Sequence, residues 1–113
     1  DSNKPKLIAR RSALDYSMSD DKTYKSFIIT QRNGMRHEII VDADRYDEVI
    51  KHSWYIQPNH GRFRAIRKFN GRFQKLHHFI IGYPPKGMAV DHINRNSLDN
   101  RMCNLRFVTY AEN

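Results

Sequence analysis

Hydrophobic and polar residues alternate with a period of two in several short segments of this 113-residue chain, which predicts strands joined by tight turns. The first two strands are expected at residues 24–30 and 35–41, which are rich in β-branched and aromatic residues. The Asn-Gly pair at 33–34 tolerates positive φ, so these strands should form a hairpin. A short helix should follow, with Asp42 or Asp44 as its N-cap.

Three more strands are expected at residues 53–57, 62–68 and 72–75, with turn-forming residues between them. Side chains alternate between the two faces of a strand, so residues 62–68 separate into two sets. One set is mainly basic and should point outward, whereas the other is mainly apolar and should pack on the core. The basic set is Arg62, Arg64 and Ile66, and the apolar set is Phe63, Ala65 and Arg67.

The whole chain mixes strands with short helices, which predicts an α+β fold. Residues 76–81 are apolar enough to form a buried helix, which Gly82 should end. Residues 1–22 carry few aromatic side chains and are expected to be a tail or linker. A basic antiparallel-sheet module is then expected over residues 23–82.

Residues 83–113 are expected to form a separate C-terminal unit. Its predicted order is a strand at 88–90, a long Asn-rich loop, a second strand at 105–108 and the start of a helix. Thr109 and Glu112 have the spacing of a capping box, in which each side chain bonds the backbone amide of the other residue.

The charge balance narrows the class of partner. The chain has 20 Lys and Arg against 12 Asp and Glu, which gives a net charge of +8 and a pI near 9.9. Between Val49 and Val90 there are eight Lys and Arg and no Asp or Glu. Such a segment produces a positive surface suited to phosphate backbones, although a basic face that serves only solubility would have the same composition.

Cysteine and histidine usage argue against structural metal sites. The single Cys103 excludes an internal disulfide and a Cys-rich zinc site, and it fits a reducing compartment such as the cytoplasm. His77 and His78 lack the spacing of structural zinc ligands. No stretch approaches the ~20 apolar residues of a membrane span, so no membrane partner is expected.

The C-terminal unit carries residues suited to phosphodiester hydrolysis. Asp91 offers a carboxylate and Asn113 a carboxamide oxygen, which are ligands that Mg²⁺ prefers. His92 titrates near neutrality and is the candidate general base, and Asn104 could orient its imidazole. Each residue also has an ordinary structural explanation. Moreover, Asp91 and His92 are adjacent, so they share a site only if the strand ends or bulges there.

The C-terminal unit resembles the ββα-metal (HNH) finger of HNH endonucleases, especially those of the phage and homing type. Four motifs carry the resemblance, namely Val-Asp-His-Ile-Asn from Val90, Leu-Asp-Asn-Arg from Leu98, Asn-Leu-Arg from Asn104 and Thr-x-x-x-Asn from Thr109. The resemblance implies that His92 is the general base and that Asn104 supports the hairpin. It also implies that Asp91 and Asn113 bind one divalent cation, expected to be Mg²⁺ with Mn²⁺ as the alternative.

Residues 41–82 resemble the module that precedes the finger in many phage HNH proteins, which is compared with the DNA-reading sheet of Apetala-type transcription factors. Its Trp-Tyr strand, basic hairpins and Leu-His helix carry this second resemblance. The DNA contacts expected from the basic strands and the loop of the finger are Arg62, Arg64, Arg67, Lys68, Arg72, Lys75 and Arg95.

Two features depart from the family pattern. Relatives usually have Gly where this chain has Arg95, which is strained if the turn requires positive φ, or else adds a phosphate contact. The expected helix would stop at Asn113 after one turn, so the natural protein is expected to continue.

These observations predict a metal-dependent endonuclease that acts on double-stranded DNA, as a monomer that nicks or as a homodimer, without a small-molecule cofactor. One alternative is a non-catalytic phage DNA-binding or regulatory protein. Another is an RNA-directed or structure-selective binder that uses the same basic sheet.

Overall fold

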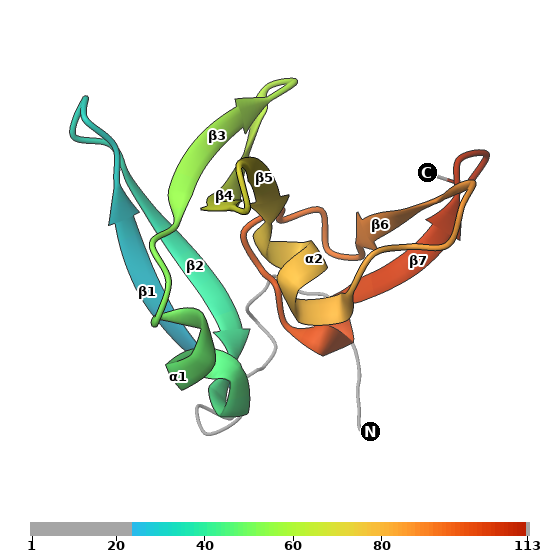
Figure 1. Ribbon diagram of the computed structural model, residues 1–113, viewed down its shortest axis with the longest axis horizontal. Helices are drawn as coiled ribbons and strands as arrows, with labels where there is room; N and C mark the ends of the chain where they lie inside the picture. Colours follow the sequence, from blue (N-terminus) through green and yellow to red (C-terminus); the bar gives the residue numbers. More distant parts are fainter. Residues whose placement is uncertain (1–23, 113) are drawn as a thin grey trace.

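The computed structural model describes residues 24–112, which form three small antiparallel sheets joined by short helices (Figure 1). The expected α+β class is confirmed, whereas the expected tail at 1–22 and Asn113 lie outside the described residues. The elements are β1 (Tyr24–Thr30), β2 (Arg36–Asp42), η2 (Ala43–Arg45), α1 (Tyr46–Val49), β3 (Tyr55–Asn59), β4 (Arg62–Phe69), β5 (Arg72–Lys75), α2 (Leu76–Ile81), β6 (Met88–His92), η3 (Met102–Asn104) and β7 (Leu105–Thr109).

The first sheet is the predicted hairpin of β1 and β2, with Tyr24 opposite Asp42 and Thr30 opposite Arg36. The helix that follows begins as the 3-10 turn η2 and continues as α1. Asp42 occupies the expected N-cap position with an extended backbone, but its side chain makes no capping bond. The Asp42 carboxylate instead accepts a hydrogen bond from the Met102 amide at 2.9 Å, so it joins β2 to a distant loop.

The second sheet has the order β3-β4-β5. Its β3 strand starts at Tyr55, two residues later than expected. Trp54 precedes it as a buried core residue, whose indole Nε1–H donates to the Val49 carbonyl at 2.8 Å. The predicted tight turn between β4 and β5 is confirmed, since Asn70 and Gly71 both have positive φ (53° and 75°).

Arg67 lies on the face of β4 that the predicted alternation assigns to the core, which contradicts its expected role as a DNA contact. Its side chain is only 9% exposed, and its guanidinium lies 4.2 Å from the ring centre of Phe69 and 5.0 Å from that of Phe79. Its Nε–H also donates to the Gln74 side chain at 2.8 Å. Arg67 is therefore a core residue and not an accessible DNA contact, because aromatic rings and hydrogen bonds satisfy its charge within the fold. Ile66, expected to point outward, is likewise buried at 7% exposure.

The third sheet pairs β6 with β7 and forms the two strands of the predicted finger. The capping box is present: the Thr109 amide donates to the Glu112 carboxylate at 2.8 Å, and the Glu112 amide donates to the Thr109 hydroxyl at 3.3 Å. Within the described residues, 110–112 form a turn after β7. The start of a helix, which was expected after Thr109, is not formed within these described residues.

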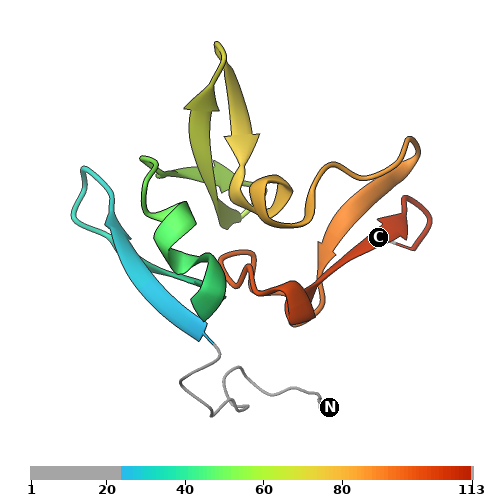
Figure 2. The same cartoon turned by 60° about the horizontal axis from the view of Figure 1, so that its bottom comes forward.

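The three sheets point away from a shared centre, which α2 and the two short helical turns help to fill (Figures 1 and 2). Each sheet contributes apolar side chains to this centre, and the buried cluster comprises Ile39, Val41, Val49, Trp54, Ala65, Leu76, Ile80 and Leu105. Within the described residues, no helix has the length and apolar character required to cross a membrane. The expected boundary between a sheet module and a finger at residue 82 stays a prediction.

The loop between β6 and β7 docks on β2 through backbone hydrogen bonds. The Ile40 amide donates to the Leu98 carbonyl at 2.9 Å, and the Asn100 amide donates to the Ile40 carbonyl at 2.7 Å. These bonds make an isolated parallel bridge between Ile40 and Asp99. The finger is thereby attached to the first sheet at a point about 60 residues earlier in the chain, counting from residue 40 to residue 99.

A buried charged pair holds this loop in shape. Asp99 is fully buried, and its two carboxylate oxygens accept hydrogen bonds from Nε (2.8 Å) and a terminal nitrogen (2.6 Å) of Arg101. One of the same oxygens also accepts from the Asn94 side-chain amide at 2.8 Å. A buried carboxylate with this many donors is satisfied, but its partners would be left uncompensated if it were removed.

We expect Asp99→Ala to lower the free energy of unfolding by about 3–5 kcal/mol, because it breaks the buried ion pair with Arg101 and removes the acceptor of the Asn94 side-chain amide. Urea unfolding measures the loss. Glu48→Ala is the matched control, since Glu48 pairs with Lys51 at 3.6 Å on the surface and should cost less than about 1 kcal/mol. Equal losses for the two variants would contradict the structural role given to Asp99.

Candidate active site

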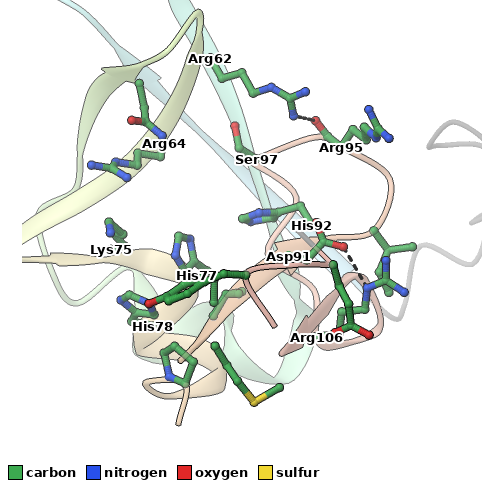
Figure 3. A pocket seen from close by; sticks show the side chains of 18 of the residues that line it. Arg62, Arg64, Lys75, His77, His78, Asp91, His92, Arg95, Ser97 and Arg106 are labelled. Carbon is green, nitrogen blue, oxygen red and sulfur yellow. Dashed lines mark hydrogen bonds and ion pairs between the residues drawn. The ribbon is translucent and has the colours of Figure 1, made fainter. Parts of the chain in front are cut away.

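An open cleft of about 880 Å³ lies between the second sheet, α2 and the β6–β7 finger (Figure 3). Arg62 and Arg64 from β4 and Lys75 from the end of β5 come from the sheet side. The other side carries Asp91 and His92, the last two residues of β6. The cleft brings the predicted acid and the predicted base together with cations from a different sheet.

Asp91 and His92 share the cleft although they are neighbours on one strand. Asp91 lies opposite Arg106 in the β6–β7 register, and Arg106 Nε–H donates to its carboxylate at 2.9 Å. β6 ends at His92, and the chain then turns, with the Arg95 amide donating to the His92 carbonyl at 2.9 Å. Asp91 and His92 were expected to share a site only if the strand ended or bulged there, and β6 does end at His92.

His92 is oriented by Asn100. Its Nε2 lies 2.9 Å from the Asn100 side-chain oxygen, which can only accept, so Nε2 carries the proton and donates. In the neutral ring this leaves Nδ1 with the lone pair needed by a base. Asn100 itself is 1% exposed, and its amide is bonded to β2 through Ile40.

The role first expected for Asn104, orientation of the imidazole, is wrong. Its side-chain oxygen accepts from the Asn94 amide at 2.9 Å, and its Nδ2 donates to the Asp99 carbonyl at 2.8 Å. Asn104 therefore holds the loop of the hairpin, as the family resemblance implies. Sequence reasoning missed Asn100 because an Asn in a polar loop ordinarily bonds its own backbone, and nothing local distinguishes one such Asn from another.

Burial keeps the histidines of the cleft neutral. Burial lowers the pKa of His92, although the hydrogen bond from Asn100 acts in the opposite direction. Burial, followed by the neighbouring His92, lowers the pKa of His77 to about 2. The ring centres of His77 and His92 lie 5.2 Å apart. A neutral His92 is the form that can accept a proton near pH 7.

The cleft is electropositive. Burial and then the nearby Arg64 lower the pKa of Lys75, and burial followed by Lys75 and Arg64 lowers that of His78. Five Lys and Arg side chains line the cleft against two carboxylates, which is the positive field expected at a phosphate-binding surface. The cations are Arg62, Arg64, Lys75, Arg95 and Arg106, and the carboxylates are those of Asp91 and Glu112.

The expected DNA contacts separate into three groups. Arg62, Arg64, Lys75 and Arg95 line the cleft, as does Arg106, which sequence reasoning did not include. Lys68 and Arg72 are exposed on the second sheet outside the cleft, whereas Arg67 is buried as described above.

Arg95 occupies a strained backbone position. Its φ is +68°, so the departure from glycine noted in the sequence does place a side chain in the left-handed region. Its carbonyl accepts a hydrogen bond from Arg62 at 3.1 Å, which ties the turn of the finger to β4. The side chain is exposed and lines the cleft.

The donor set suits a hard divalent cation shared with substrate. Asp91 offers a carboxylate in the cleft, and its pair with Arg106 is partly exposed (27% and 57%), so exchange of that partner costs little. Asn113, the second expected ligand, lies outside the described residues. Within residues 24–112 there is no group of three His, Cys, Asp or Glu side chains placed to hold a metal ion. One carboxylate fits Mg²⁺, which commonly keeps waters and takes phosphate oxygens as ligands.

Comparisons with known proteins support the interpretation of the finger. Residues 77–113 match the family described as HNH endonuclease. The chain is 30% identical over 121 aligned positions to an uncharacterized HNH endonuclease of Acanthamoeba polyphaga mimivirus, covering 99% of this chain and 62% of that relative. The chain thus spans less than two thirds of that relative's length. No solved structure matches.

These findings confirm the expected resemblance to HNH endonucleases. The family match begins at residue 77. The resemblance of residues 41–82 to the Apetala-type module therefore stays a prediction.

Arg95→Gly should raise the free energy of unfolding by about 0.5–1 kcal/mol, because glycine adopts positive φ without steric cost. Urea unfolding is the measurement. Arg95→Ala removes the same side chain but keeps the strain, so it should bring no gain. A similar stabilisation by both variants would show that charge, and not backbone strain, is the cause.

Proposed function

We propose that this chain hydrolyses phosphodiester bonds of DNA in the cleft between the second sheet and the finger. The match of residues 77–113 to the HNH endonuclease family supports the proposal. The observation that carries the proposal is the placement of His92. It is half-buried, held through Nε2 by Asn100, and shares the cleft with carboxylates and several cations.

His92 is proposed to act as the general base. A water beside Nδ1 would give up its proton to the ring as it attacks phosphorus. Asn100 favours this step because its bond to Nε2–H fixes the tautomer and the ring plane, and stabilises the imidazolium that forms. The lowered pKa of His92 makes the base available at neutral pH.

The cations of the cleft are proposed to position the DNA strand. Arg62, Arg64 and Lys75 form one side and would contact phosphates on either side of the bond to be cut. Their present mutual repulsion would be relieved by the phosphate charge, so binding gains from a cost already present in the free protein.

HNH endonucleases generally use a divalent metal ion, and we propose Mg²⁺ held by Asp91 together with Asn113. When bound, such an ion stabilises the charge on the leaving oxygen. Asp91 would have to exchange Arg106 for the cation, and Arg106 would then be free to contact phosphate. One cleft per chain implies that a monomer nicks one strand, and a double-strand break requires two copies or two events.

A second candidate is a non-catalytic DNA-binding protein. The electropositive cleft favours it, since the same cations would bind DNA whether or not His92 acts as a base. Substitution of His92 distinguishes the two functions. It should abolish cleavage by a nuclease, whereas a protein that only binds DNA would not cleave DNA with or without His92.

His92→Asn should reduce nicking of supercoiled plasmid in Mg²⁺ at least about 100-fold, which is the usual contribution of a general base. His60→Asn is the matched control. His60 is exposed in the turn before β4 with φ +52°, a conformation that Asn tolerates, and it does not line the cleft. Plasmid binding should be similar for both variants. Unchanged nicking by His92→Asn would remove His92 as the base.

The nicking rate should rise with pH as His92 loses its proton and level off before the ordinary histidine value of 6.5, because burial lowers its pKa. Asn100→Ala should move this rise to lower pH, since the Asn100 bond raises the pKa of His92. Asn100→Asp should move it to higher pH, because a carboxylate favours the imidazolium. Rate profiles that do not move in opposite directions would contradict the assigned contact.

A further inference from the structure

We infer that the open face of the second sheet binds unpaired DNA bases next to the cleft; the inference rests on the proposed function in taking DNA as the ligand. The strand register defines this face. Between β3 and β4, the opposite pairs on this face are Tyr55 with Ile66, Gln57 with Arg64, and Asn59 with Arg62. Between β4 and β5, the pairs are Ile66 with Lys75 and Lys68 with Phe73. We call these nine residues the sheet face.

The sheet face continues out of the cleft. At one end, Asn59, Arg62, Arg64 and Lys75 line the cleft beside His92. Further along β4 the next positions on this face are Ile66 and Lys68, which lie about 7 and 13 Å beyond Arg64 at the usual rise of a strand. A DNA strand that leaves the cleft along this sheet would therefore pass over these rows.

Two large aromatic rings stand in those rows. Tyr55 is 57% exposed and Phe73 is 66% exposed. Among the described residues, no aromatic ring or cation stacks on either ring. The opposite face of the same sheet differs, since the exposed Phe69 there is covered by the Arg67 guanidinium at 4.2 Å.

Each exposed ring has a cation beside it. Phe73 lies directly opposite Lys68, and Tyr55 lies in the same cross-strand row as Lys75, with the buried Ile66 between them. Rings that stack on bases, interleaved with cations that contact phosphates, are the combination that binds single-stranded nucleic acid. Scattered exposed aromatics are ordinary on protein surfaces, but these two share one face with the cations of the cleft.

The exposed rings favour unpaired bases, because a duplex leaves only the edges of its bases accessible and not their faces. Bases inside a duplex already stack on their neighbours and offer only their edges to a protein. A base must leave the stack before Tyr55 or Phe73 can cover its face. The sheet face therefore selects DNA that is melted or unpaired beside the scissile phosphate, whereas the cations alone would bind any duplex.

Fluorescence anisotropy with a chelator present tests the inference without cleavage. The ligands are a labelled duplex and the same duplex with a central unpaired bubble, both at one salt concentration. The unmodified chain should bind the bubble roughly ten-fold more tightly, since stacking of one base accounts for about that factor. Equal affinity for the two ligands would overturn the inference.

The double variant Tyr55→Leu/Phe73→Leu keeps apolar side chains at both positions but removes the rings. It should lose most of the preference for the bubble while its affinity for the intact duplex stays the same. Phe107→Leu is the control, because Phe107 is an exposed aromatic (36%) on β7 that does not line the cleft. A loss of affinity for both ligands in equal measure would mean that the rings support the fold or general binding only.

Thermal unfolding of each variant shows whether the fold is intact, and the single variants Tyr55→Leu and Phe73→Leu keep the test valid if the double variant unfolds. Failure of this inference is distinct from failure of the proposed activity. A preference for the bubble without nicking would support base binding by the sheet face and contradict the proposed nuclease activity. Nicking without a preference for the bubble would support the activity and contradict base binding by the sheet face.

Discussion

The attachment of the polar 98–104 loop to β2 is the constraint on which the site depends. Of its apolar residues, Leu98 packs against the core whereas Met102 and Cys103 are exposed, so hydrophobic burial alone cannot fix the path of the loop. Its position is set instead by backbone bonds to Ile40 and by the buried Asp99, whose carboxylate is bonded by Arg101 and Asn94. A buried polar network of this kind is stable only when each member is satisfied, so it admits few alternative conformations. Asn100, placed by this network, then sets the ring plane of His92.

The cleft concentrates charge that the fold leaves uncompensated. Burial, and then the nearby Arg64, disfavour the charged form of Lys75 and lower its pKa. A protein whose surface served solubility alone would gain by separating such groups. Arg67 shows the alternative solution, since its charge is satisfied inside the fold by Gln74 and by aromatic rings. On one side of β4, Arg67 stabilises the fold. On the other side, Arg62 and Arg64 line the cleft and remain available to bind an anion.

Local signals in the sequence were sufficient for the turns and strands, but not for the partners of polar side chains. Asn70-Gly71 determines its hairpin because both residues accept positive φ, and the alternation along β4 follows from strand geometry. The same alternation places Arg67 on the core side of β4, where it is buried. The sequence does not show that Gln74 and aromatic rings satisfy its charge there, so Arg67 was also expected to contact DNA. The sequence also could not show that Asn100, and not Asn104, bonds His92. That choice depends on the contacts of Asn100 with β2 and of Asn104 with Asn94, which are set by the tertiary fold.

Three connections between distant segments determine the width of the cleft. Ser97 donates from its hydroxyl to the Phe63 carbonyl, and Arg62 donates to the Arg95 carbonyl, so the finger is joined to β4 twice. The bonds at Ile40 join the same loop to β2. Arg62 and His92 line the same cleft, so the bond from Arg62 to the Arg95 carbonyl links a side chain proposed to contact DNA to the turn that follows His92. The strained φ of Arg95 is tolerated because the surrounding bonds fix this turn, and a turn fixed in this way places base and cations before the substrate arrives.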